Sequence, residues 1–362
     1  MIITGNKEQN MPSNSNKETD IIRKVAGNFA RHPSQVNQLM EADAEIIQRN
    51  GEYLVLKTDG IHEEIKTKLY EDPYLIGWMA VTAPISDVAA VGAVPEGILL
   101  SVQMPLHEDD DWLKQIQAGI NDACLRYNMY VLGGDTNFSD SVSISTTAVA
   151  HIKAGRPLLR TGMEPGECLY ATSLLGTGNA FAYSRFFNQA LDVQFHPVAR
   201  LVESKILRTY ATSCIDTSDG LFPALAVLSE LNNVGFHLET PLLKLLSEDA
   251  RAVHRQEGLP DWMLLAGPHG EYELLFTVAS ERQNEFEKEC ESEGWKPVYL
   301  GKVTTTPQLG FISGPLKIQC DPHTIANLFY ESNGDILAYL QLLKQQHEKW
   351  VTKNECTQLR TG

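Results

Sequence analysis

Five aspartates of this chain share one local context, in which an apolar segment ends and small residues follow. They are Asp59 in LKTDG, Asp87 in APISDVAAVGA, Asp135 in LGGDTN, and Asp216 and Asp219 in IDTSDGL. Small neighbours allow a ligand to approach the backbone, and glycine also permits positive φ. Carboxylates gathered in a crevice raise one another's pKa, and Mg²⁺ removes that cost because it prefers oxygen ligands and bridges carboxylates to phosphates. The pattern therefore predicts acids that converge as metal ligands around a polyphosphate.

A second interpretation of the same residues is purely structural. Asp and Gly are common in turns, and Asp and Ser are preferred at helix N-termini, where their side chains cap free N–H groups. Under this interpretation Ser218 or Asp219 caps a helix that begins near residue 220. The two interpretations differ in whether the carboxylates meet in space.

The charge of the chain argues against two classes of partner. Asp and Glu number 46 against 30 Lys and Arg, which gives a formal net charge of −16 over 362 residues. Such a chain repels nucleic acid and anionic membranes, so neither is expected as a partner. No apolar run approaches the roughly 18–20 residues that span a bilayer. The N-terminus carries Ser, Asn and Lys where a signal peptide has its apolar block, so we expect a cytoplasmic protein.

The six cysteines are scattered along the chain and form no CxxC pair. Reduced, mostly buried thiols are therefore expected rather than a zinc site or a disulfide framework. Cys356 lies in a polar segment near the end of the chain and is interpreted as incidental.

The order of apolar segments predicts a mixed α/β chain with two folded units. Up to residue 152 the expected order is strand, helix, strand, helix, strand, strand. A turn at Pro165-Gly166 followed by a new strand, CLYATS, places a boundary near residue 155. The predicted parts are a disordered tail (1–20), an N-terminal domain (21–155), a C-terminal α/β domain (156–330) and a C-terminal helical extension (331–362).

The common nucleotide-binding and catalytic motifs are absent. The chain has no GxxxxGK[ST] loop, no GxGxxG between a strand and a helix, and no HRD or DFG of the protein kinases. The segment LLGTGNAFA (174–182) has only two of the glycines and is interpreted as a turn before a helix. If the chain binds ATP, we expect it to do so through acids and Mg²⁺.

Six segments, taken in order, resemble those of the AIR synthase-related (PurM-like) superfamily. They are TDG, SDVAAVGAVP, LGGDT, LLRTGMEPGECLYATSLLG, DTSDGL and EYELLFTV, spread over roughly residues 40–310. This superfamily includes AIR synthase, selenophosphate synthetase and the hydrogenase-maturation dehydratase, and the chain is most similar to its thiamine-monophosphate kinases. The resemblance implies an N-terminal domain that forms a homodimer through its sheet, and a C-terminal α/β domain of different topology. ATP and several Mg²⁺ ions would lie in the cleft between them.

The resemblance also implies roles for individual residues. The implied metal ligands are Asp43, Thr58, Asp59, Asp87, Asp135, Asp216 and Asp219. The implied nucleotide contacts are Gly134, Asp135, Arg160 and Ser218, the implied catalytic residues are Asp59, Asp135 and Asp219, and the implied acceptor contacts are His62 and Glu271. The implied reaction is in-line phosphoryl transfer from ATP to a small polar or phosphorylated metabolite, driven by positioning and charge neutralisation.

Three segments depart from the resemblance. Where the family has GDDAAV, the chain has Glu41-Ala42-Asp43-Ala44-Glu45, so we expect either one metal ion fewer or compensation by Glu41 or Glu45. Where the thiamine-monophosphate kinases have GGEDYEL, residues 268–274 read PHGEYEL, which predicts a changed acceptor. The stretch after Asp59 is more similar to AIR synthase, and His62 within it is equally well interpreted as a surface histidine.

These departures leave two other functions open. One is ATP-dependent activation of an amide oxygen followed by cyclisation or dehydration, which would liberate free phosphate instead of a phosphorylated acceptor. The other is a protein that binds nucleotide without turnover, which the alanine at position 42 favours. The helix near residues 334–353 is expected either to cover the substrate cleft or to extend the dimer interface.

Overall fold

The structure is a computed structural model that describes residues 17–106 and 109–361. Most of the predicted disordered tail, residues 1–16, lies outside the described residues. The last four residues of that tail are instead helical, since α1 begins at Lys17 and ends at Ala26. There the backbone N–H of Lys17 donates to the side chain of Asn327 in α11 (His323–Glu331). None of the helices in the described ranges is long and apolar enough to cross a membrane.

The first half of the chain forms a five-stranded sheet. Its strands are β1 (Glu45–Arg49), β2 (Glu52–Gly60), β3 (Val94–Met104), β4 (Tyr130–Phe138) and β5 (Ser143–Ile152). Their order is β1-β2-β5-β3-β4, and only the pair β3–β4 is parallel. Along the central strand β5, half-buried and buried residues alternate, as expected for a strand with one covered face.

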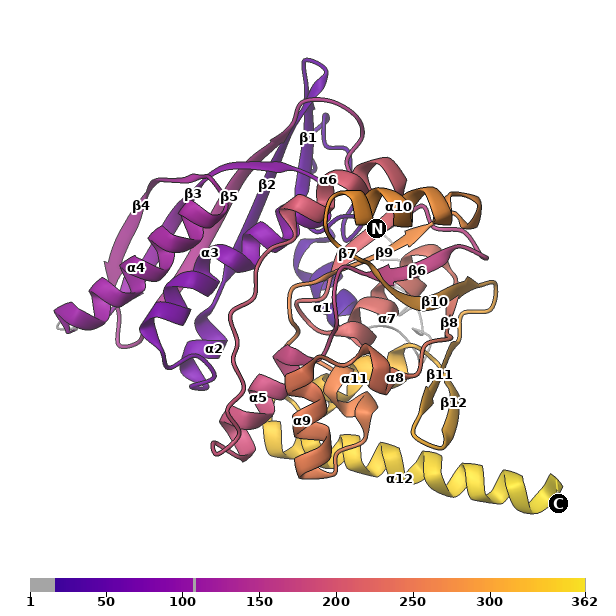
Figure 1. Cartoon of the computed structure of the whole chain (residues 1–362). Coiled ribbons are helices and arrows are strands. Elements are labelled where there is room, and N and C mark those ends of the chain that lie inside the picture. The colour runs from indigo at the N-terminus through magenta and orange to yellow at the C-terminus, as the bar shows by residue number, and fades with distance from the viewer. Residues whose placement is uncertain (1–16, 107–108, 362) are drawn as a thin grey trace, which may run out of the picture.

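Two helices, α3 (Pro73–Ala90) and α4 (Asp110–Arg126), cover that face of the sheet (Figure 1). The helix α3 begins after Asp72, whose side chain accepts the N–H of Tyr74. The two helices touch at Gly77 and Gly119, where an added Cβ would lie 2.0 and 2.1 Å from a backbone oxygen of the opposite helix. The absence of a side chain at both positions therefore allows this close helix contact.

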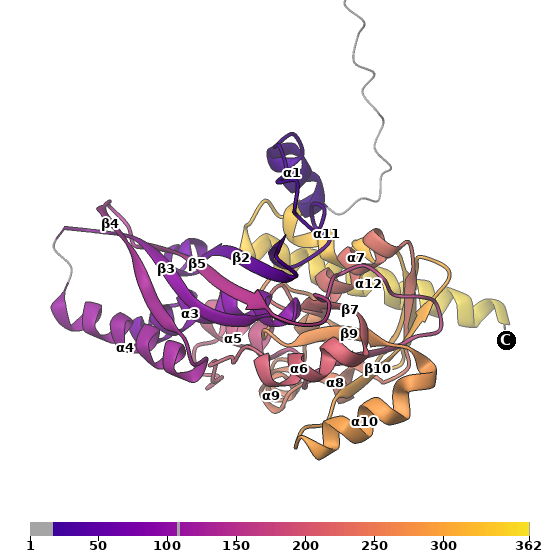
Figure 2. The ribbon, with the colours of Figure 1, turned by 90° about the horizontal axis from the view of Figure 1, so that it is seen from above.

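The second half forms a seven-stranded sheet in the order β12-β11-β8-β10-β6-β9-β7. Its strands are β6 (Cys168–Ala171), β7 (Ala211–Asp216), β8 (Gly235–Leu238), β9 (Leu274–Val278), β10 (Val298–Thr304), β11 (Leu309–Ser313) and β12 (Leu316–Cys320). One face packs on α6 (Leu201–Tyr210) and α10 (Gln283–Ser292). The other packs on α7 (Leu221–Asn232), α8 (Leu242–Leu245), α9 (Glu248–Glu257) and two later helices (Figure 2). The expected mixed α/β fold with two units is confirmed.

The predicted C-terminal extension is helical and docked on this second unit. The helix α12 (Ile336–Thr361) packs on α11 and β12. Its Trp350 lies edge-on to Trp262, with ring centroids 5.0 Å apart, and to Phe311 at 5.9 Å. The first turns of α12 are thereby held beside the loop that follows Trp262, where Tyr339 donates its hydroxyl to the carbonyl of Gly267.

The two units meet along the C-terminal end of α3. Ala89 and Ala90 of this helix are fully buried in the same apolar cluster as Leu207 of α6 and Phe276 of β9. This packing places the last turn of α3 beside the end of β7, which is where the acidic residues of the two units approach each other.

Candidate active site

Three buried aspartates from distant parts of the chain meet where the two units adjoin. Asp43 precedes β1, Asp87 lies in the last turn of α3, and Asp216 ends β7. One carboxylate oxygen of each lies within 4.8 Å of the other two, and each residue is at most 5% exposed. For these three residues the structure favours the metal-ligand interpretation over turn chemistry.

Two serines orient the carboxylate of Asp216. Ser86 of α3 donates to its Oδ2 at 2.7 Å, and the hydroxyl of Ser218 donates to its Oδ1 at 2.8 Å. The N-cap of α7 is Gly220, which has no side chain to cap the helix. The interpretation of Ser218 or Asp219 as the cap is therefore wrong, because the hydroxyl of Ser218 is engaged with Asp216.

Two cations partly neutralise these acids. Lys57 of β2 places its ammonium 3.0 Å from Oδ2 of Asp87, and Arg160 places Nη2 2.9 Å from Oδ1 of Asp43. An acid in the last turn of a helix is disfavoured by the helix dipole, so Asp87 needs such a partner. Burial raises the pKa of both Asp87 and Asp216, while Lys57 acts in the opposite direction. Burial disfavours the Lys57 ammonium too, but Asp87 and Asp59 outweigh that cost and raise the pKa of Lys57.

The donor set fits a divalent metal ion. Oδ2 of Asp43 is buried and has no hydrogen-bond partner among the described residues, although its other oxygen is held by Arg160. An unsatisfied buried carboxylate oxygen is costly unless a cation approaches it. Carboxylate oxygens that converge in this way are the ligands that Mg²⁺ prefers.

The cluster opens into a cleft of about 740 Å³ between the two units. Most of the residues predicted from the sequence line it: Asp43, Thr58, Asp59, Asp87, Arg160, Asp216, Ser218 and Asp219. Two charged residues that were not predicted, Lys57 and Glu64, line it as well. A second cavity of about 660 Å³ adjoins this cleft and shares Glu64, Asp219, Pro268 and His269 with it. Its other walls come from α5 (Thr177–Phe187), α11 and α12.

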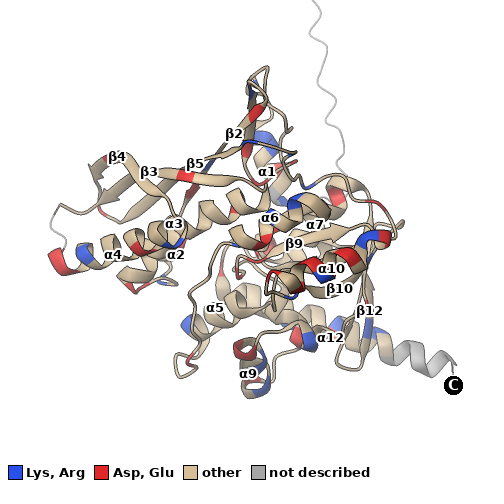
Figure 3. Cartoon of the chain, turned by 45° about the horizontal axis from the view of Figure 1, so that its top comes forward, with Lys and Arg blue, Asp and Glu red and all other residues tan. Residues whose placement is uncertain are grey.

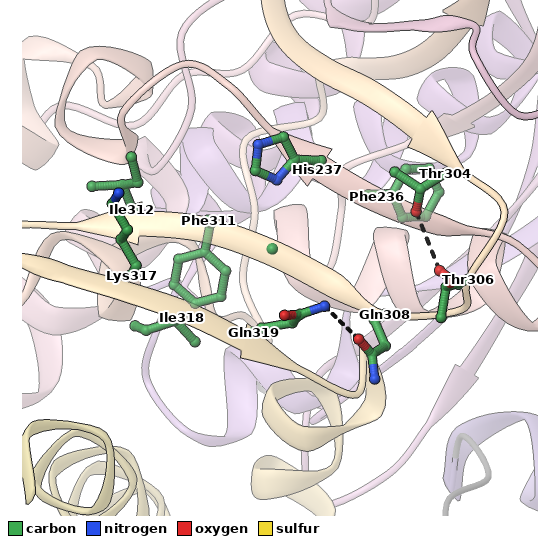
Figure 4. Close-up of a pocket in the computed structure, with 11 residues that line it drawn as sticks. Phe236, His237, Thr304, Thr306, Gln308, Phe311, Ile312, Lys317, Ile318 and Gln319 are labelled. Carbon is green, nitrogen blue, oxygen red and sulfur yellow. Dashed lines mark hydrogen bonds between the residues drawn. The ribbon is translucent and has the colours of Figure 1, made fainter. Parts of the chain in front are cut away.

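A third cavity, of about 520 Å³, lies on the far strands of the second sheet (Figure 4). It is lined by residues of β8, β10, β11 and β12, among them His237, Phe311 and Lys317. No carboxylate lines it. Most of the acidic residues predicted from the sequence therefore line the cleft between the units or the cavity beside it, and none of them lines this third cavity.

Comparison with known proteins places this geometry in a family. Residues 41–152 match the family model of the AIR synthase related protein, N-terminal domain. Thiamine-monophosphate kinase of Methanospirillum hungatei JF-1 is 30% identical over 277 residues, which cover 74% of this chain and 84% of that protein. The chain belongs to the thiamine-monophosphate kinase family. The same enzyme of Bacillus subtilis is 24% identical over 287 residues, covering 75% and 87% of the two chains.

Solved structures agree with this assignment at the level of the fold. AaThiL complexed with AMPPCP and TMP has a TM-score of 0.64 and 24% identity, with 79% of this chain and 89% of that chain covered. The hydrogenase maturation protein HypE of E. coli has a TM-score of 0.63 and 17% identity, with 84% and 95% covered. The superfamily recognised from six short segments is therefore confirmed.

Gly134 and Asp135 do not join the cluster within one chain. They lie in the edge strand β4, and β3 and β5 separate that strand from β2, which carries Asp59. Three strand spacings of about 4.8 Å put β4 about 14 Å from β2. Asp135 is exposed and accepts a hydrogen bond from Asn137 instead. The sequence predicts that five aspartates of one chain converge. Asp135 does not meet the others within one chain, because the strands β5 and β3 lie between β2 and β4.

Thr58 lines the cleft and is predicted to offer a backbone or a hydroxyl oxygen to a metal ion, and the structure bears only on the hydroxyl. Its hydroxyl lies 2.9 Å from that of Thr147 in β5. Side chains alternate between the two faces of a strand, so Thr58 points away from the face that presents Lys57 and Asp59 to α3. The hydroxyl of Thr58 is therefore engaged on the opposite face of the sheet.

The two predicted acceptor contacts have different surroundings. His62 lines the second cavity, and its Nδ1 is buried without a hydrogen-bond partner among the described residues. Glu271 lines neither cavity, because its carboxylate accepts the N–H of Gly176 at 2.6 Å and the hydroxyl of Thr217 at 3.0 Å. Burial raises the pKa of Glu271 to about 8. Glu271 therefore braces the start of α5, and its contact with an acceptor stays a prediction.

The departures in sequence have local explanations. An added Cβ at Gly270 would lie 1.7 Å from the carbonyl oxygen of Thr217, so no side chain fits there. Glu41 accepts the N–H of Gln38, and Glu45 accepts from Arg31 and Asn37. Both carboxylates are thus engaged in hydrogen bonds, but Glu45 also lines the cleft, so compensation for the alanine at position 42 stays a prediction.

Sequence reasoning missed two charged residues of the cleft, Lys57 and Glu64. Lys57 precedes Thr58-Asp59 in an ordinary strand pattern, and a lysine in a strand usually faces solvent. Glu64, in the short helix α2 (His62–Lys66), lines both cavities, and its Oε2 is buried without a partner in the described part of the chain. The only signal for either was its closeness in sequence to Asp59.

Proposed function

We propose that this chain transfers the terminal phosphoryl group of ATP to thiamine monophosphate. Membership of the thiamine-monophosphate kinase family supports the reaction. The observation that carries the proposal is the junction of the two cavities, which share Glu64, Asp219, Pro268 and His269. A triphosphate in the acidic cleft and an acceptor in the adjoining cavity would meet at this junction.

The chemistry of the second cavity suits thiamine monophosphate. Six aromatic side chains line it: Tyr183, Phe186, Phe187, Phe329, Tyr330 and Tyr339. Aromatic faces attract cations, and the thiazolium ring of thiamine carries a positive charge next to a second aromatic ring. Glu63 and Glu64 add negative charge on the wall nearest the metal cleft. The phosphate of the acceptor would then lie toward Asp219 and the rings toward α12.

The residues of the cleft have separable roles in this proposal. Asp43, Asp87 and Asp216 would hold Mg²⁺, which supplies neutralisation of the charge that spreads over the phosphate oxygens during transfer. Arg160 fixes Asp43 from the second unit and lines the cleft beside it. Ser86 and Ser218 keep the carboxylate of Asp216 in one orientation. This preorganisation lowers the barrier because no ligand has to be ordered as the reaction proceeds.

The direct test is an assay of purified protein with Mg²⁺, ATP and thiamine monophosphate. We expect equal amounts of ADP and thiamine diphosphate. Free phosphate without thiamine diphosphate would instead favour ATP-dependent activation of an acceptor. Nucleotide binding without formation of ADP would indicate a protein that binds nucleotide without turnover.

Leu340 provides a test of the acceptor cavity. It lies on the wall formed by α12, so Leu340→Trp should fill the space meant for the rings of the acceptor. We expect KM for thiamine monophosphate to rise about tenfold or more while KM for ATP is unchanged. Leu337→Trp is the matched control, because Leu337 lies on the same helix and is 66% exposed. Equal effects of the two variants on KM would place the acceptor elsewhere.

We also propose that the chain forms a homodimer through the sheet of its first unit. Every residue of β4 is exposed, and apolar side chains of β3 and β4 are 42–72% exposed: Leu99, Tyr130, Val131, Leu132 and Phe138. These strands are largely uncharged, as Figure 3 shows, with Glu96 and Asp135 as their acids. An apolar, weakly charged sheet edge favours pairing with a second copy. Gly134 and Asp135 would lie in that interface.

A charge introduced on this face should separate the two copies. Leu99 pairs with Thr147 and Gly133 in the sheet and is 42% exposed. Leu99→Glu would bury an unpaired carboxylate in a dimer, so we expect sedimentation velocity to show a monomer. Leu125→Glu, on α4 and 77% exposed in the wild type, should remain dimeric. A wild-type protein that sediments as a monomer would contradict the proposal.

A further inference from the structure

The ammonium of Lys57 lies beside the cluster of Asp43, Asp87 and Asp216, and the resemblance to the family does not predict this positive charge. The ammonium of Lys57 lies 3.0 Å from Oδ2 of Asp87, and the side chain of Asp87 is only 7% exposed. Lys57 lies on the same face of β2 as Asp59, which also lines the cleft. This lysine is thus part of the cleft wall and reaches Asp87, the acid in the last turn of α3.

An ammonium that holds a carboxylate oxygen disfavours a divalent ion at the same oxygen, because the two cations repel each other at short range. Mg²⁺ binds oxygen at about 2.1 Å and demands nearly octahedral geometry around itself. An ammonium at hydrogen-bond distance occupies one of the approach directions and repels a second cation at short range. While Lys57 binds Oδ2 of Asp87, a metal ion beside that oxygen would meet the positive charge of the ammonium, 3.0 Å from the oxygen.

The opposite side of the cluster is open. Oδ2 of Asp43 is buried and has no hydrogen-bond partner among the described residues. The residue before it is Ala42, and the carboxylates of Glu41 and Glu45 accept hydrogen bonds from Gln38 and Asn37. The cluster therefore offers fewer free carboxylate oxygens than its number of aspartates suggests.

We infer that the ammonium of Lys57 takes the place of a divalent ion beside Asp87, so that this chain binds one metal ion fewer than it would with a neutral residue at position 57. The inference rests on the metal–nucleotide cleft of the proposed function. It assigns Lys57 a positioning role, because the lysine forms an ion pair with the buried carboxylate of Asp87.

The test counts metal ions without turnover. Wild type and Lys57→Met are titrated with Mn²⁺ in the presence of saturating AMPPCP, and free Mn²⁺ is measured by electron paramagnetic resonance. We expect Lys57→Met to bind one more Mn²⁺ per chain than the wild type. Lys57→Arg, which keeps the charge, should bind the wild-type number. Lys114→Met should do the same, because it removes a lysine from an exposed pair with Asp111.

An equal or smaller number of bound ions in Lys57→Met overturns the inference. If that variant does not fold, the wild type still decides the matter through anomalous scattering from crystals grown with Mn²⁺ and AMPPCP. We expect no manganese within coordination distance of Oδ2 of Asp87, and a peak there would refute the role of Lys57. Because both measurements are made without an acceptor, failure to phosphorylate thiamine monophosphate would leave them unaffected. Absence of Mn²⁺ binding in every protein would refute the metal site and this inference together.

Discussion

Asp216→Asn is expected to lower the rate of phosphoryl transfer by about a thousandfold, which corresponds to about 4 kcal/mol of lost transition-state stabilisation. Asparagine keeps the shape of the side chain and can still accept from Ser86 or Ser218, but it removes the negative charge that would bind metal. The buried cluster would keep Asp43 and Asp87 as its acids. The measurements are kcat and the Mg²⁺ concentration at half-maximal rate, and both should change.

The control for this substitution is Asp111→Asn. Asp111 lies in the first turn of α4, and its side chain is 78% exposed, so its loss should leave the rate unchanged. A melting temperature of Asp216→Asn equal to or above that of the wild type would show that the variant is folded. An Asp216→Asn enzyme with more than about a tenth of the wild-type rate would contradict the assignment of Asp216 as a metal ligand.

Trp262→Ala is expected to lower the free energy of unfolding by about 4 kcal/mol, near the upper end for loss of a large buried side chain. Trp262 is fully buried in the core of the second unit, lies edge-on to Trp350 of α12 and donates Nε1–H to His347 at 3.3 Å. The substitution leaves a cavity and weakens the attachment of α12. Urea denaturation gives the free energy, and KM for thiamine monophosphate should rise because α12 forms a wall of the acceptor cavity.

Phe29→Ala serves as the control for Trp262→Ala. Phe29 is 69% exposed, so the same class of substitution should cost less than about 0.5 kcal/mol there. A loss of stability in Trp262→Ala without any change in KM would show that α12 helps to fold the second unit but does not shape the acceptor site.

Several features of the fold follow from local sequence patterns. The alternating residues of β5 and the apolar run of β2 were recognisable as strands, and α3, α4 and α12 as helices, because periods of 2 and 3.6 residues are properties of short segments. Asp87 and Asp216 were recognisable as candidate ligands for a similar reason. Each stands at the end of an apolar element beside small residues, a position that is typical of a metal ligand and also of a turn or cap residue.

Long-range packing decided which of those candidates meet. Asp135 has the same local context as Asp59, yet β5 and β3 lie between their strands, and no local pattern records the order of strands in a sheet. Glu271 matched an acceptor-contacting segment, but the packing of that segment against Thr217 and the start of α5 uses its carboxylate internally.

The amino-acid sequence by itself determined the α/β class, the superfamily and the chemistry of the acidic residues, since each depends on residue type and short-range spacing. Only the tertiary structure decided that Lys57 reaches Asp87 and that α12 lines the second cavity. The physical reason is that such contacts depend on how helices and strands far apart in the chain pack together, and that packing minimises the free energy of the whole core instead of any single segment.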